Sequence, residues 1–267
     1  MACKLKYSSS SLNNLSQNQK HKFSITHSIM IYQANAVYSF IPKNACSTMR
    51  LSVAHANGCI DSIEQGHWIH ANNGTFNATL GEAIKADYTF TILRCPFRRL
   101  ASVFLDKFVA KEPLAWSYRT RLERKIELDS LTFRDFVKSL TKAGMLRSDI
   151  HWRPQVDFLL YSQYHDYFCL ENFEEIVRVL KDKIDFKVID ARSLTNHGLS
   201  ELKAINTDCF ADSEAFDIAI MKRNGECPDY NSMYDDELYL TVSNLYREDI
   251  QLYKDKFSDS DILKIVR

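Results

Sequence analysis

The spacing of apolar residues along the chain alternates between the period of a strand and the period of a helix. The segments 36–42 and 88–94 are rich in β-branched and aromatic residues, which is typical of buried strands. Pro42 closes the first segment and Pro96 lies just after the second, where a strand is expected to stop. Each strand is therefore predicted to lead through a turn into a helix.

The first helix is expected over 47–57, with Ser47 as its N-cap and Gly58 as its stop. The second is expected over 97–111. Its apolar residues follow the i, i+3, i+4, i+7 rule for one buried face, and they are Phe97, Leu100, Ala101, Phe104, Leu105 and Phe108.

The stretch "LTFRDFVKSLTKAG", residues 131–144, predicts a further helix. Thr132 is its expected N-cap and Asp135 completes a capping-box-like start, because each side chain can accept a bond from the other's backbone N–H. Gly144 is expected to end the helix, since glycine readily takes the left-handed conformation found after a last turn.

Residues 166–173 and 186–190 predict short strands on either side of a helix over 174–184. The stretch 235–256 predicts one long helix whose apolar stripe packs on the body of the protein, formed by Tyr239, Val242, Tyr246, Ile250 and Tyr253. Strands that alternate with helices indicate an α/β fold, with a mostly parallel central sheet and helices on both faces. Ligands of such sheets bind at the carboxyl ends of the strands.

The first 28 residues are rich in Ser, Asn, Gln and Lys, so we expect a flexible N-terminal arm over 1–28. A single domain is expected over 29–267. Lysine and arginine number 34 and aspartate and glutamate also number 34, so no overall charge favours nucleic acid or an anionic membrane. If the protein binds phosphate, the positive charge for it must therefore come from a local group of residues.

The 7 cysteines are scattered and form no C-x-x-C pair. This pattern speaks against a disulfide framework and against a zinc site, and it favours a reducing compartment. The chain shows no apolar run that resembles a signal peptide or a membrane span. We therefore expect a cytoplasmic protein with no transmembrane segment and no metal, while the oligomeric state is not indicated.

The turn "FIPKNACSTMR", residues 40–50, places a lysine and two hydroxyl residues where a helix begins. Backbone N–H groups at a helix N-terminus bind anions, and here Ser47 and Thr48 add hydroxyl donors while Lys43 adds a positive charge. The turn lacks the glycines of a nucleoside-triphosphate P-loop. The alternative is a solvated lysine beside an ordinary capped helix.

The second turn carries a similar group of residues. Arg94 ends its strand, and Ser102 is expected on the polar face of the following helix beside Arg98 and Arg99. An arginine and a hydroxyl that converge from a strand end and a helix flank can hold a second phosphate. The alternative is that Arg94 is only a surface charge.

These turns resemble motifs of the sulfotransferase family 2, specifically of the carbohydrate sulfotransferases related to chondroitin 4-sulfotransferase. "IPKNACSTMR" is similar to the family's 5′-phosphosulfate loop, and "LRCPFRRLASVFLDKF" to its 3′-phosphate motif. Further similarity lies in "HWRPQ" (151–155), "YHDYFCLENFEEI" (164–176) and "LYREDIQLY" (245–253). The resemblance spans about residues 36 to 255, and it implies a P-loop-like sulfotransferase fold.

The resemblance implies transfer of a sulfuryl group from 3′-phosphoadenosine 5′-phosphosulfate (PAPS) to an acceptor hydroxyl on a carbohydrate, without a metal. Lys43 would contact the bridging oxygen and the 5′-phosphate. The rest of the loop would complete the cradle, namely Asn44, Ala45, Cys46, Ser47 and Thr48. Arg94 and Ser102 would hold the 3′-phosphate, and Arg223 is similar to a basic segment that closes over the donor in relatives.

Two histidines in "EQGHWIHANN", His67 and His70, are candidates for the base that accepts the hydroxyl proton. An imidazole with an ordinary pKa near 6.5 suits this task at neutral pH. By resemblance His67 comes first and His70 second. Both can also be polar packing residues. His151 and Trp152 of the "HW" element either line the acceptor cleft or support the fold.

Two other functions remain open at this point. One is a kinase or NTPase, for which "KVIDA" (187–191) resembles the strand of a Mg²⁺ site but lacks a glycine-rich loop. The other is a catalytically silent nucleotide- or glycan-binding module with the same fold. The acceptor is not fixed, because a fold does not set specificity.

Overall fold

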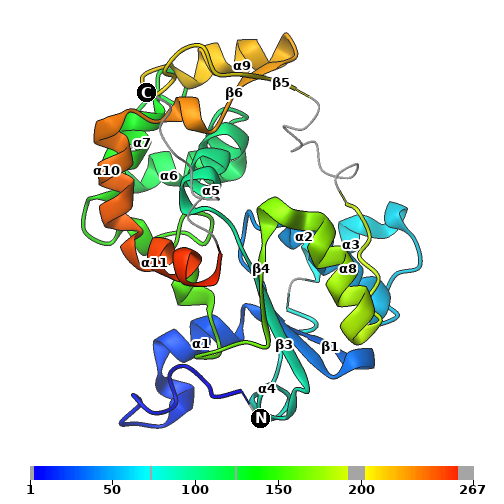
Figure 1. Ribbon diagram of the computed structural model, residues 1–267. Helices are drawn as coiled ribbons and strands as arrows, with labels where there is room; N and C mark the ends of the chain where they lie inside the picture. The colour runs from blue at the N-terminus through cyan, green and yellow to red at the C-terminus, as the bar shows by residue number, and fades with distance from the viewer. Residues whose placement is uncertain (1–2, 73, 124, 192–201, 258–267) are drawn as a thin grey trace. The chain divides into compact units, whose positions relative to one another are not determined.

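The computed structural model describes residues 3–72, 74–123, 125–191 and 202–257 (Figure 1). These residues form two compact units. Within the described residues, the first unit contains 3–94 and 155–191, and the second contains 95–154 and 202–257. The predicted single domain over 29–267 stays a prediction.

The first unit is built on a four-stranded sheet in the order β1-β2-β3-β4. The strands are β1 (Ser28–Ile31), β2 (Ala36–Ser39), β3 (Tyr88–Leu93) and β4 (Asp166–Cys169). β1 pairs antiparallel with β2, while β2 with β3 and β3 with β4 are parallel. The predicted mostly parallel sheet is confirmed. β2, β3 and β4 are each shorter than the stretch that indicated them, and β1 was not predicted.

Helices cover both faces of this sheet, as the sequence predicts. The helices of the first unit are α1 (Gln19–Ile25), α2 (Cys46–Ala56), α3 (Trp68–Ala71), α4 (Leu80–Lys85) and α8 (Phe173–Ile184). α2 and α8 pack on one face. α1 and the 3₁₀ turn Gln155–Phe158 lie against the other, where Ser28 Oγ donates to the carbonyl of Ser24 and Phe23 packs edge-on against Phe158.

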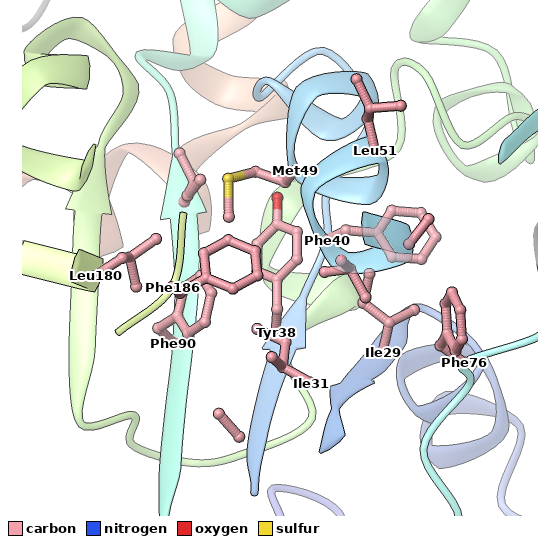
Figure 2. Packing of buried hydrophobic residues seen from close by; sticks show 14 of the residues in the cluster. Ile29, Ile31, Tyr38, Phe40, Met49, Leu51, Phe76, Phe90, Leu180 and Phe186 are labelled. Atoms are coloured by element: carbon pink, nitrogen blue, oxygen red, sulfur yellow. The ribbon is translucent and has the colours of Figure 1, made fainter. Parts of the chain in front are cut away.

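The face under α2 and α8 is an apolar core. Tyr38 of β2 stacks on Phe90 of β3 with ring centroids 4.9 Å apart, and both side chains are fully buried. Figure 2 shows these rings between Met49 of α2 and Leu180 of α8. Burial of side chains of this size contributes about 1.5–3 kcal/mol each, so this cluster holds α2 on the sheet.

The opposite face of the sheet is buried but polar. Tyr164 OH donates to Ser39 Oγ at 2.7 Å, and Ser39 Oγ lies 2.7 Å from Ser28 Oγ. Thr91 Oγ1 donates to the carbonyl of Ser39 at 2.9 Å. Because each hydroxyl has a partner, this face avoids the cost of unpaired buried polar groups.

The predicted strand over 186–190 is wrong. These residues form no strand, and the chain runs beside α2 instead of joining the sheet. Ile189 N donates to Ser52 Oγ at 2.8 Å, and Ala191 N donates to Thr48 Oγ1 at 3.4 Å. Hydroxyls of α2 therefore satisfy backbone groups that a neighbouring strand was expected to satisfy.

The second unit is mainly helical and carries a small parallel sheet of β5 (Lys203–Ile205) and β6 (Glu226–Pro228). Its helices are α5 (Pro96–Val103), the π-helical segment Phe104–Phe108, α6 (Pro113–Arg121), α7 (Phe133–Leu140), α9 (Ala215–Arg223), α10 (Asp236–Leu245) and α11 (Arg247–Lys256). Aromatic rings fill its core, including Phe108, Tyr118, Phe136 and Trp152.

The predicted buried face of the helix over 97–111 is confirmed, because all six apolar residues are buried. The predicted polar face is wrong, since Arg99 and Ser102 are 2% and 3% exposed. Arg99 donates from its guanidinium to the carbonyls of Arg153 and Ile150, at 2.8 and 3.2 Å. Ser102 Oγ donates to the carbonyl of Arg99 at 2.7 Å. Backbone carbonyls, and not water, therefore accept the hydrogen bonds of these two side chains.

Two predicted helix ends also differ from the structure. The capping box of Thr132 and Asp135 is confirmed at the start of α7, but α7 ends at Leu140 and Gly144 opens the following turn with φ +80°. The predicted single helix over 235–256 is two helices, because Tyr246 leaves helical geometry (φ −111°, ψ 27°). Tyr246 OH donates to the carbonyl of Trp152 at 2.5 Å, which fixes the break.

The expected flexible arm over 1–28 stays a prediction, although its described residues make specific contacts. Leu5 is 7% exposed and forms an antiparallel bridge with Tyr161. Lys6 N donates to the carbonyl of Leu160 at 2.8 Å, and Lys6 Nζ to the carbonyl of Val156 at 2.6 Å. We call the segment around Leu5 and Lys6 the strap. In the structure it lies along residues 156–161.

Leu5 and Leu12 provide a matched test of the strap. Leu5→Ala removes buried methyl groups, so we expect a loss of about 2–5 kcal/mol in the free energy of unfolding, measured by urea denaturation. Leu12 is fully exposed, so Leu12→Ala is expected to change it by less than about 0.5 kcal/mol. Equal, negligible effects would mean that the arm is flexible in solution.

Candidate functional site: an anion site at two strand ends

The loop from β2 to α2 has an unusual backbone. Lys43 (φ +71°) and Ala45 (φ +56°) both take positive φ values although neither is glycine. Ala45 is the N-cap of α2, and the helix begins at Cys46. The prediction of Ser47 as the N-cap is therefore wrong, because the left-handed turn at Ala45 starts the helix before Ser47 is reached.

This turn leaves the start of α2 open for an anion. Ala45 provides no side-chain cap, so the first N–H groups of the helix, from Cys46 to Thr48, lack partners within it. A left-handed residue followed by helical residues forms a concave set of N–H groups that binds anions. Ser47 makes no side-chain hydrogen bond to the described residues, whereas Thr48 Oγ1 is buried against Ala191 N.

The Asn44 side chain lies inside this corner, between the loop after β2 and the end of β3. Its side chain is fully buried, and Nδ2 donates to the carbonyl of Ile92 at 2.8 Å and to Gln155 Oε1 at 2.7 Å. Asn44 N donates to the carbonyl of Ile41 at 3.2 Å. The amide group therefore ties the loop after β2 to the end of β3 and does not face outward toward a ligand.

Gln155 completes the junction between the two strand ends. It is 1% exposed, and its Oε1 accepts from Arg94 N at 3.1 Å while its Nε2 donates to the carbonyl of Arg94 at 2.8 Å. Arg94 Nη1 in turn donates to the carbonyl of Lys43 at 3.0 Å. The structure thus brings Lys43 and Arg94 together at the carboxyl ends of β2 and β3.

Arg50 connects this corner to α3. It lies on α2 one turn after Cys46, and its Nη2 donates to the carbonyl of Ile69 at 2.7 Å. Burial lowers the pKa of the Arg50 guanidinium, and burial raises the pKa of Tyr38 well above the usual value, so this phenol stays neutral. Figure 2 shows Tyr38 with its ring in the core beneath α2.

His67 and His70 are exposed residues of the same unit. His67 ends the 3₁₀ turn Ile63–His67, and His70 lies on α3. The contact of Arg50 with Ile69 places this segment beside α2, so the segment that carries both histidines is attached to the helix of the anion site.

The other predicted site residues belong to the second unit. Ser102 has its hydroxyl directed to its own helix, and Arg223 is exposed at the last residue of α9. Trp152 is fully buried and its Nε1 donates to the carbonyl of Met145 at 2.8 Å. Trp152 therefore supports the fold, because a buried ring cannot stack on a sugar.

His151 is partly exposed and forms a pair with Asp149. His151 Nδ1 lies 2.8 Å from Asp149 Oδ1, and His151 N donates to the same oxygen at 3.0 Å. Burial alone would raise the pKa of Asp149, but the bonds from His151 and the charges of His151 and Arg121 outweigh it and hold this pKa below its usual value. The carboxylate stays ionised and orients the imidazole.

No cluster of three or more His, Cys, Asp or Glu side chains suited to a metal occurs in the described part of the chain. Within that same part, no helix combines the length and the apolar character that a membrane span requires. The residues that the structure brings together at this corner are Lys43, Asn44, Arg94 and Gln155, next to the first turn of α2.

Comparison with known proteins decides the family. The model of the Sulfotransferase family matches residues 26–257, which include the whole four-stranded sheet and both strand-end turns. The chain belongs to this family. No curated protein and no solved structure matches it. Membership supports a sulfotransferase function, and the α/β fold agrees with it.

Three residues that hold predicted site residues or their segments in place escaped the sequence analysis. They are Gln155 and Arg50 in the first unit and Asp149, beside His151, in the second. Gln155 lies within the "HWRPQ" element, where only the histidine and tryptophan were considered. Its contacts with Asn44 and Arg94 span 111 and 61 residues of chain, so local spacing could not reveal them. The sequence indicated a role for Gln155 through its place in the "HWRPQ" motif.

We expect Gln155→Ala to destabilise the protein by at least about 2 kcal/mol in urea denaturation. The change leaves the N–H and carbonyl of Arg94 without their partner, and a buried polar group left unpaired costs roughly 1–3 kcal/mol. Gln251, an exposed glutamine of α11, is the control, and Gln251→Ala should change stability by less than about 0.5 kcal/mol. Similar effects of both changes would contradict the buried junction.

Proposed function

We propose that this protein transfers a sulfuryl group from PAPS to a hydroxyl group of a carbohydrate acceptor. The observation that carries the proposal is the joined pair of strand ends, where Arg94 Nη1 contacts the carbonyl of Lys43 beside the uncapped start of α2. Two positive side chains and a set of free helix N–H groups suit a donor with an anionic group at each end.

When bound, PAPS supplies the sulfuryl group and a bisphosphate leaving group. Lys43 and the N–H groups of Cys46 and Ser47 are assigned to the 5′ side, where they would offset the charge that grows as the S–O bond breaks. Ala45 shapes this turn through its positive φ value. Asn44 and Thr48 have their polar side-chain atoms turned to the protein interior, so they support the loop.

Arg94 is assigned to the 3′-phosphate, which distinguishes this donor from ATP. An arginine suits a phosphate because its planar N–H groups can bind two oxygens at once. Ser102 Oγ donates to the carbonyl of Arg99, so it can donate to a phosphate only if that bond breaks. Arg223 remains a further candidate for the donor on the strength of the family resemblance alone.

His67 is assigned as the base that accepts the proton of the acceptor hydroxyl, with His70 as the second choice. The segment that carries them is held beside α2 by Arg50. Direct transfer needs a base close to the acceptor oxygen and a positive environment for the leaving group. His151 is proposed to contact the acceptor.

The acceptor is proposed to be a glycan because the motifs are similar to those of carbohydrate sulfotransferases. We also propose that the reaction takes place in the cytoplasm. None of the seven cysteines forms a disulfide in the structure, which suits a reducing compartment. No role in nucleic acid binding is proposed, since the chain has no net charge.

Donor binding can be tested by thermal shift with 3′,5′-adenosine bisphosphate beside 5′-AMP. At about 100 times Kd, a ligand stabilises its protein by about 2.7 kcal/mol. We expect a clear rise in Tm with the bisphosphate only, and we expect Arg94→Ala to abolish the difference. Arg178→Ala, a change at an exposed arginine of α8, is the control and should preserve it.

Equal shifts for the two nucleotides in the unmodified protein would count against the assignment of Arg94 and against PAPS as donor. A nucleotide effect that requires Mg²⁺ and favours ATP would instead favour a kinase.

The base can be tested by His67→Gln, with His70→Gln as the matched comparison. General-base catalysis contributes about 10²–10⁴-fold, so we expect His67→Gln to lower kcat by at least about 100-fold and to remove the acid limb of the pH profile of kcat/KM. The thermal shift with the bisphosphate should persist in both variants. If His70→Gln gives the larger loss, the two assignments are exchanged; if neither lowers kcat, a base in this segment is excluded.

A further inference from the structure

Helix α9 of the second unit is apolar on more of its surface than the core requires. Its sequence "AFDIAIMKR" has only one polar residue, Asp217, before the basic end. Ala215 and Ile218 are buried and face the core. A helix that is apolar on all sides is expected to be covered on all sides, yet part of α9 lies at the surface.

The uncovered part of α9 is a stripe at helical spacing. It consists of Phe216, Ala219, Ile220 and Arg223, at positions i, i+3, i+4 and i+7. Phe216 is 49% exposed and Ile220 is 38% exposed. The stripe is therefore an apolar surface that ends in a positive charge.

This stripe forms one wall of a pocket of about 300 Å³. Val109 and Ala110, at the end of the π-helical segment, form the facing apolar wall. Lys111, Asp129 and Lys222 complete the lining. Its volume is at the lower end of the range of small-molecule sites, about 300–1,000 Å³.

The charge at the rim of the pocket is positive. Lys111 is paired with Asp129, and Lys222 Nζ donates to the carbonyl of Leu105 at 3.1 Å. Arg223 is exposed and has no hydrogen-bond or ion-pair partner among the residues that the structure describes. The pocket lining thus carries three positive groups and one negative group, and the exposed guanidinium lies at the end of the apolar stripe.

The two basic residues at the end of α9 also have a simpler role. Positive side chains in a last turn favour the helix because they face the negative end of its dipole. That role explains the charge, but it explains neither the apolar stripe that leads to Arg223 nor the concave surface between α9 and Val109.

We propose that this pocket binds a small amphipathic anion, a molecule with a short aromatic or acyl body and one acidic group. The apolar body would lie between Phe216, Ile220 and Val109. The acidic group would accept hydrogen bonds from Arg223, and charge-assisted bonds of this kind are about twice as strong as neutral ones.

The shape of the site favours a small molecule over a protein partner. A specific protein interface buries about 1,200–2,000 Å² of surface, whereas this pocket is a single depression between one helix and one turn. The positive rim makes a cationic ligand unfavourable. A purely apolar ligand would cover part of the rim without providing a partner for Arg223.

The proposal is tested with 8-anilinonaphthalene-1-sulfonate (ANS) on the full-length chain, followed by fluorescence titration. We expect saturable binding at one site, at least about tenfold weaker binding of the neutral analogue N-phenyl-1-naphthylamine, and displacement of ANS by octanoate. An aryl sulfate as a second competitor shows whether carboxylates and sulfates share the site.

Two variants separate the contributions of the apolar wall and of the charge. Ala219→Phe fills the pocket and should abolish saturable ANS binding. Arg223→Glu should weaken ANS binding at least about tenfold and leave the neutral analogue unaffected, since a bond to a charged group is lost. Arg178→Glu and Leu240→Ala are matched controls at exposed positions of α8 and α10 and should bind ANS as the unmodified protein does.

Circular dichroism and Tm establish that each variant is folded, and the exposed position of Arg223 keeps the test decisive if Ala219→Phe does not fold. Unchanged ANS binding in Arg223→Glu, or equal affinities for ANS and its neutral analogue, overturns the proposal. Displacement of ANS by 3′,5′-adenosine bisphosphate also overturns it, because Arg223 would then belong to donor binding. Failure of the proposed donor site itself leaves these outcomes unchanged.

Discussion

The candidate site depends on one buried pair of amide side chains. Asn44 and Gln155 share a 2.7 Å hydrogen bond in the interior, and each also binds backbone groups at the end of β3. Through them the loop after β2 and the end of β3 become one rigid junction. Lys43 and Arg94 flank this junction, so buried bonds fix the distance between their backbones.

This junction also explains why the loop tolerates strain. A non-glycine residue with a positive φ destabilises the folded state by of order 1–3 kcal/mol, and Lys43 and Ala45 both have such φ values. Asn44, between them, is held by three hydrogen bonds, and the carbonyl of Lys43 is held by Arg94. The strained turn exposes the first N–H groups of α2, which a relaxed turn with a serine cap would have covered.

Local sequence patterns predicted the elements well and their partners poorly. The strands at 36 and 88, the buried face of α5 and the capping box of Thr132 depend on neighbouring residues, and all were found. The N-cap of α2 was missed because the left-handed turn at Ala45 is imposed by contacts with distant residues. The strand expected over 186–190 was missed for the same reason, since hydroxyl groups of α2 bind its backbone.

Arg94 and Arg99 show how little a residue type says about its role. Both occur in one short motif, and the sequence suggested that both faced a phosphate or solvent. Arg99 is buried and its guanidinium is used by the carbonyls of Arg153 and Ile150, so it holds the chain together within the second unit. Arg94 is partly buried at a strand end, where its Nη1 donates to the carbonyl of Lys43 at 3.0 Å, so it belongs to the junction of β2 and β3 in the first unit. Two arginines of one short motif therefore stabilise different parts of the fold.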